Sequence, residues 1–83
     1  NDEYSIRKYL GSGAIKGLGL ALADRIVDKF KEDTFRIVDE EPERLEEVRG
    51  ISYKKAMDIA SQIQAKKDIR DAMIIRYFVG DES

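Results

Sequence analysis

The sequence contains no cysteine and no histidine, and it has one proline among 83 residues. Without these side chains it can form no disulfide, no thiolate zinc site and no Ser-His-Asp or Cys-His catalytic arrangement. It also lacks an apolar run near the roughly 20 residues that a membrane-spanning helix needs. No signal-peptide or transit-peptide pattern opens the chain, so we expect a cytoplasmic protein with no membrane partner.

The length allows one small domain, of a size at which roughly 60% of the unfolded chain's surface becomes buried. The composition, 42% hydrophobic and 39% charged, is too apolar for a disordered tail and predicts a soluble, helical fold. Because the chain begins at Asn1 instead of methionine and ends in Asp81-Glu82-Ser83, we expect it to be a piece of a longer protein.

The net charge of -2 is unevenly distributed. Residues 1–32 carry six Lys/Arg against five Asp/Glu, residues 33–48 carry two against seven, and residues 49–79 carry seven against three. An acidic connector therefore separates two less acidic units. Such a distribution permits nucleic-acid binding only through local basic patches or backbone donors.

The apolar and glycine positions form two copies of one pattern, with a 33-residue period. The matched pairs are Ile15/Val48, Gly17/Gly50, Leu18/Ile51, Ala23/Ala56, Ile26/Ile59, Val27/Ala60 and Phe30/Ile63, and Gly19 against Ser52 breaks the pattern. The last four pairs have i, i+3, i+4, i+7 spacing, which predicts an amphipathic helix in each copy. Ankyrin repeats share the period, but their Thr-Pro-Leu-His signature is missing and two copies rarely make a solenoid.

Caps and breakers give the remaining elements. Glycines 11 and 13 end a short first helix, Asp33 or Thr34 can cap another, and Pro42 suits the first position of a further turn. The expected helices span residues 3–10, 20–31, 34–40, 53–66 and 67–79, with the Pro42 turn over 42–47. We therefore expect a first motif over about 13–31, a connector over 33–47, a second motif over about 45–66 and a C-terminal helix.

The two junctions, residues 15–19 and 48–52, are apolar-flanked turns that lead into helix N-termini. A glycine there permits positive φ, while the first helical amides lack an internal acceptor and carry partial positive charge. The pattern predicts an anion site at each junction. A single Gly-x-Gly would more simply turn the chain between packed helices, and the duplication favours binding.

These residues resemble the helix-hairpin-helix family, whose motif reads apolar-x-Gly-apolar-Gly-x-x-x-Ala-x-x-apolar. Two joined copies resemble its paired domain, which implies an all-α bundle of about five helices with Ala23 and Ala56 at helix crossings. The resemblance implies sequence-independent DNA binding, in which hairpin amides and nearby Lys/Arg hold phosphates, often with a potassium or sodium ion at hairpin carbonyls. Phosphate contacts of this kind give affinity without base discrimination.

By this resemblance the phosphate-binding residues are Lys16, Gly17, Leu18, Gly19 and Arg25 of the first unit and Arg49, Gly50, Ile51, Ser52, Lys54 and Lys55 of the second. The first unit has both glycines but offers Leu20 and Ala21 where a basic residue often lies. The second has lysines there, but Ser52 replaces the second glycine; it would cap the helix and restrict phosphate approach. We expect the second unit to be the stronger electrostatic site, and the first, assisted by Lys16 and Arg25, the stronger backbone site.

A longer stretch, residues 4–79, resembles the region before the motor domains of RecD-like superfamily 1 DNA helicases, often named exodeoxyribonuclease V alpha-subunit-like. The strings that carry the resemblance are IRKYLGSGAIKGLGLALADRIVDKF, EEPERLEEVRGIS and YKKAMDIASQIQAKKDIRDAM. It implies an auxiliary domain that binds single-stranded or junction DNA, with helicase motor domains in cis and a role in DNA repair or recombination. GxxxxGK[ST] is absent, so we expect no enzymatic activity and no cofactor in this segment, with ATP and magnesium in the parent's motor.

Two other classes of function remain open. Sterile alpha motif domains are five-helix bundles of similar size with a Gly-Ile turn, so the chain would be a protein-interaction module or a structural spacer, with acidic residues 40–47 facing a partner. That family would not predict the 33-residue duplication. Metal-dependent catalysis by Asp39-Glu40-Glu41, or by Asp68 with Asp71, is the third class, although carboxylates without a cleft signal are usually surface charges.

Overall fold

The computed structural model describes residues 2–68, and every element in that range is helical. The elements follow as α1 (Asp2–Leu10), α2 (Leu20–Phe30), η1 (Lys31–Asp33), α3 (Thr34–Glu40), η2 (Pro42–Glu47) and α4 (Tyr53–Ala65), where η is a 3-10 helix. No strand occurs among the described residues, so the predicted all-α bundle is confirmed. Positions 69–79 of the expected C-terminal helix lie outside the described residues.

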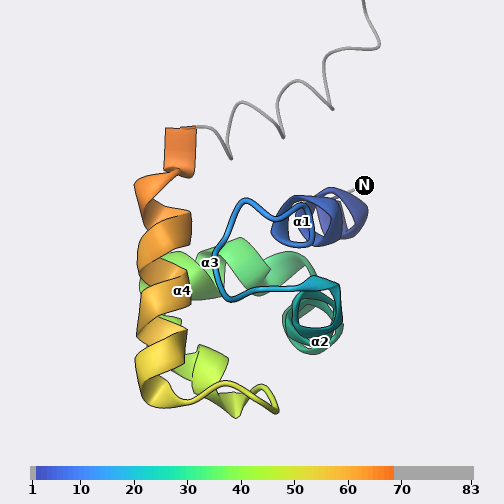
Figure 1. The fold of residues 1–83 in the computed structure, drawn as a ribbon. Coiled ribbons are helices and arrows are strands. Elements are labelled where there is room, and N and C mark those ends of the chain that lie inside the picture. The colour runs from blue at the N-terminus through green and yellow to red at the C-terminus, as the bar shows by residue number, and fades with distance from the viewer. Residues whose placement is uncertain (1, 69–83) are drawn as a thin grey trace, which may run out of the picture.

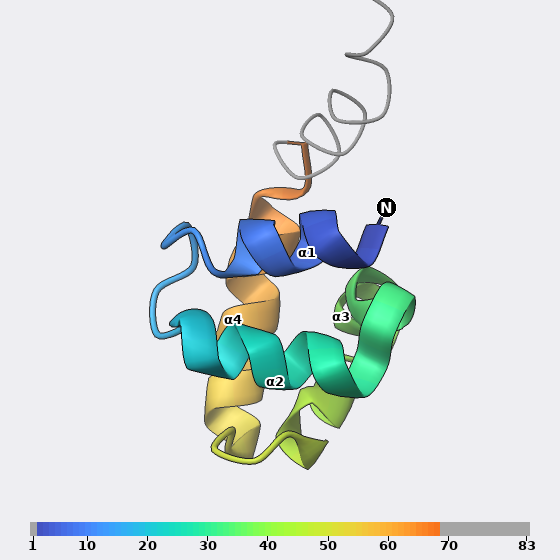
Figure 2. The ribbon, with the colours of Figure 1, turned by 90° about the vertical axis from the view of Figure 1, so that its right-hand side faces the viewer.

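Helices α1 and α2 pack side by side, and α4 runs across them (Figures 1 and 2). In Figure 1 the loop from α1 to α2 lies beside the upper part of α4, and the loop between η2 and α4 lies at the lower end. We call residues 15–19 the first hairpin and residues 48–52 the second hairpin. Since both hairpins border α4, the fold brings the two copies of the repeat into contact.

The repeat is the core of the domain. Each of its apolar residues is at most 5% exposed, and Leu10, Ile37, Val38 and Leu45 from the other elements are equally buried. Burying one large apolar side chain contributes about 1.5–3 kcal/mol relative to leaving it exposed. Ala23 and Ala56 are both completely buried. A larger side chain at either alanine would therefore have to push other core residues aside.

The connector begins differently from the expected side-chain cap. Helix α2 ends where Lys31 takes a φ of 53°, and η1 leads into α3 without a cap from the Asp33 carboxylate. The Thr34 hydroxyl is buried and donates backward to the Lys31 carbonyl, 2.8 Å away. Thr34 therefore closes the preceding turn instead of capping the following helix. Pro42 occupies the first position of η2, as expected.

The acidic connector is paired with its own arginines. Arg36 forms ion pairs with Asp33, Glu40 and Glu41, and the Glu41 hydrogen bond raises the pKa of Arg36 above its usual value. Arg44 pairs with Glu41 and Glu47. These exposed pairs contribute little individually to stability, but they leave less uncompensated charge on the connector. Across residues 2–68, no helix combines the length and apolarity needed to span a bilayer.

Candidate nucleic-acid interface

Each hairpin contains a tight turn that depends on its glycine. Gly17 has a φ of 84° and Gly50 a φ of 95°, a region that side-chain-bearing residues rarely adopt. In each turn the amide of the next residue, Leu18 or Ile51, donates to the carbonyl three residues back, at 3.3 and 3.1 Å. Because these two residues also bury their side chains, they shape the turns, and their amides are used within the turns instead of being left for a ligand.

The mismatch of Gly19 with Ser52 has a simple geometric basis. Both are helix N-caps in extended backbone, with φ and ψ of -91° and -179° for Gly19 and -81° and 170° for Ser52. Neither position needs glycine. The Ser52 Oγ accepts a hydrogen bond from the amide of Lys55 at 3.2 Å, whereas Gly19 supplies no such acceptor. Helix α2 therefore starts with one more uncapped amide than helix α4.

Each hairpin packs against the helix that follows the other hairpin. A Cβ placed on Gly17 would lie 3.9 Å from Cε of Lys55, and one placed on Gly50 would lie 3.6 Å from Cδ1 of Leu22. Leu22 and Lys55 are equivalent positions of the repeat, as are the two glycines. The two contacts are thus equivalent: the helix of each unit packs against the hairpin of the other unit.

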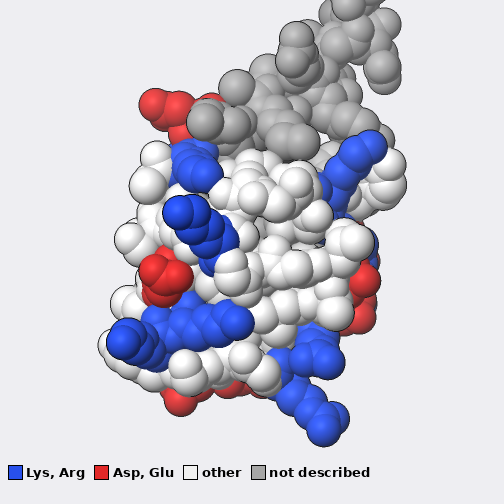
Figure 3. All heavy atoms as spheres, in the orientation of Figure 1, with Lys and Arg blue, Asp and Glu red and all other residues white. Residues whose placement is uncertain are grey.

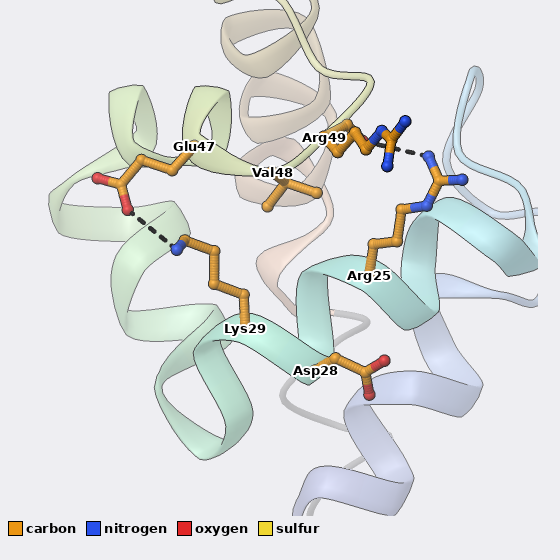
Figure 4. A pocket seen from close by; sticks show the side chains of 6 residues that line it. All are labelled: Arg25, Asp28, Lys29, Glu47, Val48 and Arg49. Atoms are coloured by element: carbon orange, nitrogen blue, oxygen red, sulfur yellow. Dashed lines mark hydrogen bonds and ion pairs between the residues drawn. The ribbon is translucent and has the colours of Figure 1, made fainter.

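Because of this crosswise packing, Arg25 lies at the second hairpin and not at the first, where it was expected. Arg25 was expected to assist the first hairpin, but its Nη1 donates to the Arg49 carbonyl at 3.3 Å and lies 3.2 Å from a Cβ placed on Gly50. Figure 4 shows the Arg25 and Arg49 guanidinium groups together on one side of a pocket, with the Asp28 carboxylate pointing away from them. At the opposite side of that pocket Lys29 pairs with Glu47 at 3.6 Å. The second hairpin therefore carries two adjacent arginines from different units.

Lys55, like Arg25, reaches the hairpin of the other unit. It was assigned to the second unit, and it does line a hollow with Ser52, Lys54 and Asp58. Its methylene chain nevertheless reaches Gly17 of the first hairpin. Lys55 thus borders both hairpins, while Lys54 stays at the second and Lys16 is an exposed residue of the first.

Two residues of the α4 region that the sequence did not single out hold the first loop in place. The Gln62 side chain accepts a hydrogen bond from the amide of Lys16 at 2.9 Å and donates to its carbonyl at 3.0 Å. The Lys66 ammonium donates to the Ala14 carbonyl at 2.6 Å. Gln62 and Lys66 are one turn apart, on the same side of the helix. The sequence shows only two polar residues four positions apart, and that spacing does not indicate that their partners lie in the loop after α1. Their role was therefore not predictable from the sequence.

The cations at the two hairpins form no ion pairs with carboxylates in the described structure, whereas the arginines elsewhere do. Arg7 pairs with Glu3, Asp24 and Asp28, and hydrogen bonds to Asp24 and Asp28 raise its pKa. In the described part of the chain no carboxylate pairs with any predicted site cation, namely Lys16, Arg25, Arg49, Lys54 and Lys55. Lys8, Lys31, Lys66 and Lys67 are likewise without one. Figure 3 shows Lys and Arg gathered over the face that α4 and the hairpin loops present, with Asp and Glu mostly toward its edges.

Carbonyls beside both hairpins already receive cationic side chains. The Lys66 ammonium lies on the Ala14 carbonyl and the Arg25 guanidinium on the Arg49 carbonyl. A potassium or sodium ion at either oxygen would meet a like charge at short range, which costs free energy. The residues present therefore do not fit a monovalent cation at these two carbonyls.

The carboxylates considered for metal binding do not form a site within residues 2–68. No group of three carboxylates capable of holding a metal ion occurs there. Glu40 and Glu41 instead form ion pairs with Arg36. Asp71, proposed as a partner for Asp68, lies outside the described residues.

Comparison with known families agrees with this geometry. Residues 3–82 match the family described as the ATP-dependent RecD2 DNA helicase HHH domain, where HHH denotes helix-hairpin-helix. Searches of curated proteins and of solved structures each found no match. The family match covers both hairpins and nearly the whole chain, and its helix-hairpin-helix description agrees with the two glycine turns that lead into helices. The chain therefore belongs to the helix-hairpin-helix domain family of ATP-dependent RecD2 DNA helicases.

Proposed function

We propose that this domain binds DNA without sequence preference, by holding backbone phosphates at its two hairpins. The observation that carries the proposal is that five cations at the hairpins lack a carboxylate partner in the described structure, and that two of them, Arg25 and Lys55, each reach the hairpin of the other unit. Cations elsewhere in the fold that face carboxylates are neutralised locally. Those at the hairpins remain available to an external anion.

The chemistry of binding follows from the hairpin geometry. The tight turn at Gly17 or Gly50 exposes the start of a helix, whose first amides are unsatisfied and carry partial positive charge. A phosphate oxygen placed there accepts hydrogen bonds from these amides, and Arg25 with Arg49, or Lys55 with Lys16, neutralises its charge. Backbone amides and cations that hold phosphate contact a part of DNA that is the same in every sequence. Binding is therefore expected to give orientation and affinity and no sequence discrimination.

The proposed setting is an auxiliary domain of an ATP-dependent DNA helicase. The family assignment supports this setting, in which ATP and magnesium would be used by motor domains joined in cis. The domain would keep single-stranded or junction DNA close to the motor during repair or recombination in the cytoplasm. Its own affinity would be weak, near the non-specific range of about 10⁻⁴ to 10⁻⁶ M, so that translocation is not stalled.

An amide-resolved NMR titration tests this function. The chain is titrated with a short single strand and with a duplex at low salt, and the series is repeated at higher salt. We expect shifts at residues 16–21 and 49–55, and a log-log salt slope of about -2 to -4 if three or four phosphates are contacted.

Two results would contradict the proposal. The absence of shifts at millimolar DNA would leave a protein-docking or spacer module, and the parent's motor domains would then be the partner to add. A tenfold preference between two sequences of equal structure would show base readout, which phosphate contacts cannot supply.

A further inference from the structure

Tyr53 is an exposed aromatic residue with no partner in the described structure. It is the first residue of α4 and is 56% exposed. Tyr4, by comparison, lies under the Lys8 ammonium at 5.6 Å, and Tyr9 packs edge-on against Phe35 with 5.9 Å between ring centroids. Among residues 2–68, the Tyr53 side chain makes no hydrogen bond and no ring contact. Its ring therefore has no structural use within the described fold.

Tyr53 lies among residues that could bind an anion, and an exposed apolar residue lies next to it. Ser52 precedes it, and Lys54 and Lys55 follow it without carboxylate partners. Met57, one turn along α4, is a further large apolar residue that is 37% exposed. Side chains on a helix incline toward its N-terminus, so the ring covers the surface next to the second hairpin. A phosphate at that hairpin would place its own nucleotide within reach of the ring.

We infer that Tyr53 stacks on an unpaired base of the strand whose phosphate the second hairpin holds, and so makes this hairpin selective for single-stranded DNA. The inference rests on the proposed function, and it adds the substrate class. Every base has an aromatic face, so stacking strengthens binding without reading sequence. In a duplex the bases are already stacked on one another, and Tyr53 gains no partner there.

The first hairpin provides the internal comparison. Leu20 occupies the position of the first unit that is equivalent to Tyr53, and it is 69% exposed. Its Cδ2 lies 2.6 Å from a Cβ placed on Gly11, so its side chain leans over the preceding loop. A leucine has no aromatic face to offer a base. The second hairpin alone, within the described residues, combines unpaired cations with an unpartnered aromatic ring at the start of its helix.

The experiment compares Tyr53→Leu with the unaltered chain. Leucine already occupies the equivalent first-hairpin position, so the variant is expected to fold, and circular dichroism checks this. Tyr53→Phe keeps the ring, and Tyr4→Leu removes a tyrosine of similar exposure, 52%, from α1. Affinity is measured for a 12-nucleotide single strand and for a blunt-ended duplex without a loop, at one salt concentration. A 2-aminopurine placed in the single strand reports stacking through loss of its fluorescence.

We expect Tyr53→Leu to weaken single-strand binding roughly 5- to 100-fold and to abolish the 2-aminopurine quenching, with duplex affinity changed less than twofold. Tyr53→Phe and Tyr4→Leu should behave as the unaltered chain does. Equal losses on both DNAs, or no loss on either, would overturn the stacking role and leave phosphate binding intact. If the unaltered chain binds neither DNA, the proposed function fails and this inference fails with it.

Discussion

The two hairpins share a backbone but differ in the charges that surround them. Their glycine turns, helix N-caps and buried residues match at the 33-residue period. The second hairpin has Arg49 and receives Arg25 from α2, whereas the first has Lys16 and is reached by the methylene chain of Lys55 from α4. Asp58 of α4 accepts a hydrogen bond from Gln62, which also holds Lys16, and it lines the hollow beside Ser52 and the two lysines. The duplicated motif thus fixes the turn, and the helix of the other copy decides how much charge faces it.

Arg25 and Asp58 show this most directly. They are equivalent positions of the repeat, and each lies on the helix that packs against the other unit's hairpin. Arg25 places a guanidinium at the second hairpin, whereas Asp58 places a carboxylate between Gln62, which holds the first hairpin, and the hollow beside Ser52. We therefore expect the second hairpin to bind phosphate more strongly, while the uncapped helix at Gly19 leaves the first with more free amides.

The largest expected effect comes from reversing the charge of Lys54, at the second hairpin, and of Lys55, which borders both hairpins. Lys54→Glu with Lys55→Glu should weaken DNA binding about 100-fold, because each charge-assisted contact contributes about 1.4 kcal/mol or tenfold in affinity. The salt slope should become shallower by about 2. Fluorescence anisotropy with a labelled oligonucleotide measures both quantities.

Lys8→Glu with Lys31→Glu is the matched control, since it makes the same change in net charge at exposed lysines outside the hairpins. A similar loss from the control pair would mean that total charge, and not the hairpin, governs binding.

The next effect is on stability and separates the two glycine turns. Gly50→Ala should lower the free energy of unfolding by about 2 kcal/mol, since a left-handed conformation costs an alanine about 1–2 kcal/mol and the added Cβ would sit 3.2 Å from Arg25 Nη1. Gly17→Ala should cost about 1 kcal/mol, because its nearest neighbour, Cε of Lys55, would lie 3.9 Å from the added Cβ, an ordinary van der Waals distance. Urea unfolding gives both values.

Gly13→Ala calibrates the backbone contribution, because Gly13 has a φ of 93° and a Cβ there would touch nothing within 4 Å. If Gly50→Ala costs no more than Gly13→Ala, crowding of the added Cβ against Arg25 adds nothing to the cost, and the predicted difference between the turns is wrong.

A smaller effect is expected at the tie between α4 and the first hairpin. Gln62→Leu removes both hydrogen bonds to Lys16 and should lower the free energy of unfolding by about 1 kcal/mol. Amide shifts around residues 15–18 should change while the second hairpin stays unaltered. Gln64→Leu breaks a comparable hydrogen bond, to the Val38 carbonyl at 2.8 Å, and should leave the first hairpin's amide shifts alone. Identical shift maps for the two variants would contradict a specific tie.

The smallest effect tests the N-caps. Gly19→Ser should raise the free energy of unfolding by a few tenths of a kcal/mol, because Gly19 already has the backbone of Ser52 and a Cβ there meets nothing within 4 Å. Ser52→Gly should lower it by a similar amount. If Gly19→Ser instead destabilises the domain, the N-termini of α2 and α4 are not equivalent. Thermal unfolding of both variants in one buffer is sufficient.

Much of the fold was predictable because it depends on local patterns. The periodicity of apolar residues gave α2 and α4 to within one residue, and the breakers around Gly11 and Pro42 gave α1 and η2. Thr34 was expected as a cap candidate, but burial turned its hydroxyl back to Lys31. The places of Arg25 and Lys55 were not predictable, since they depend on which helix packs against which hairpin.

By itself, the sequence determined that two helices would each begin at a glycine turn and bury one apolar face, because turn preference and amphipathic spacing act over a few residues. Tertiary structure decided which helix meets which hairpin. Arg25 reaches Arg49, Lys55 reaches Gly17 and Gln62 holds Lys16 only because the copies pack against each other crosswise. Such contacts join residues 24 to 46 positions apart, and they follow from how two buried faces fit together, which no local pattern encodes.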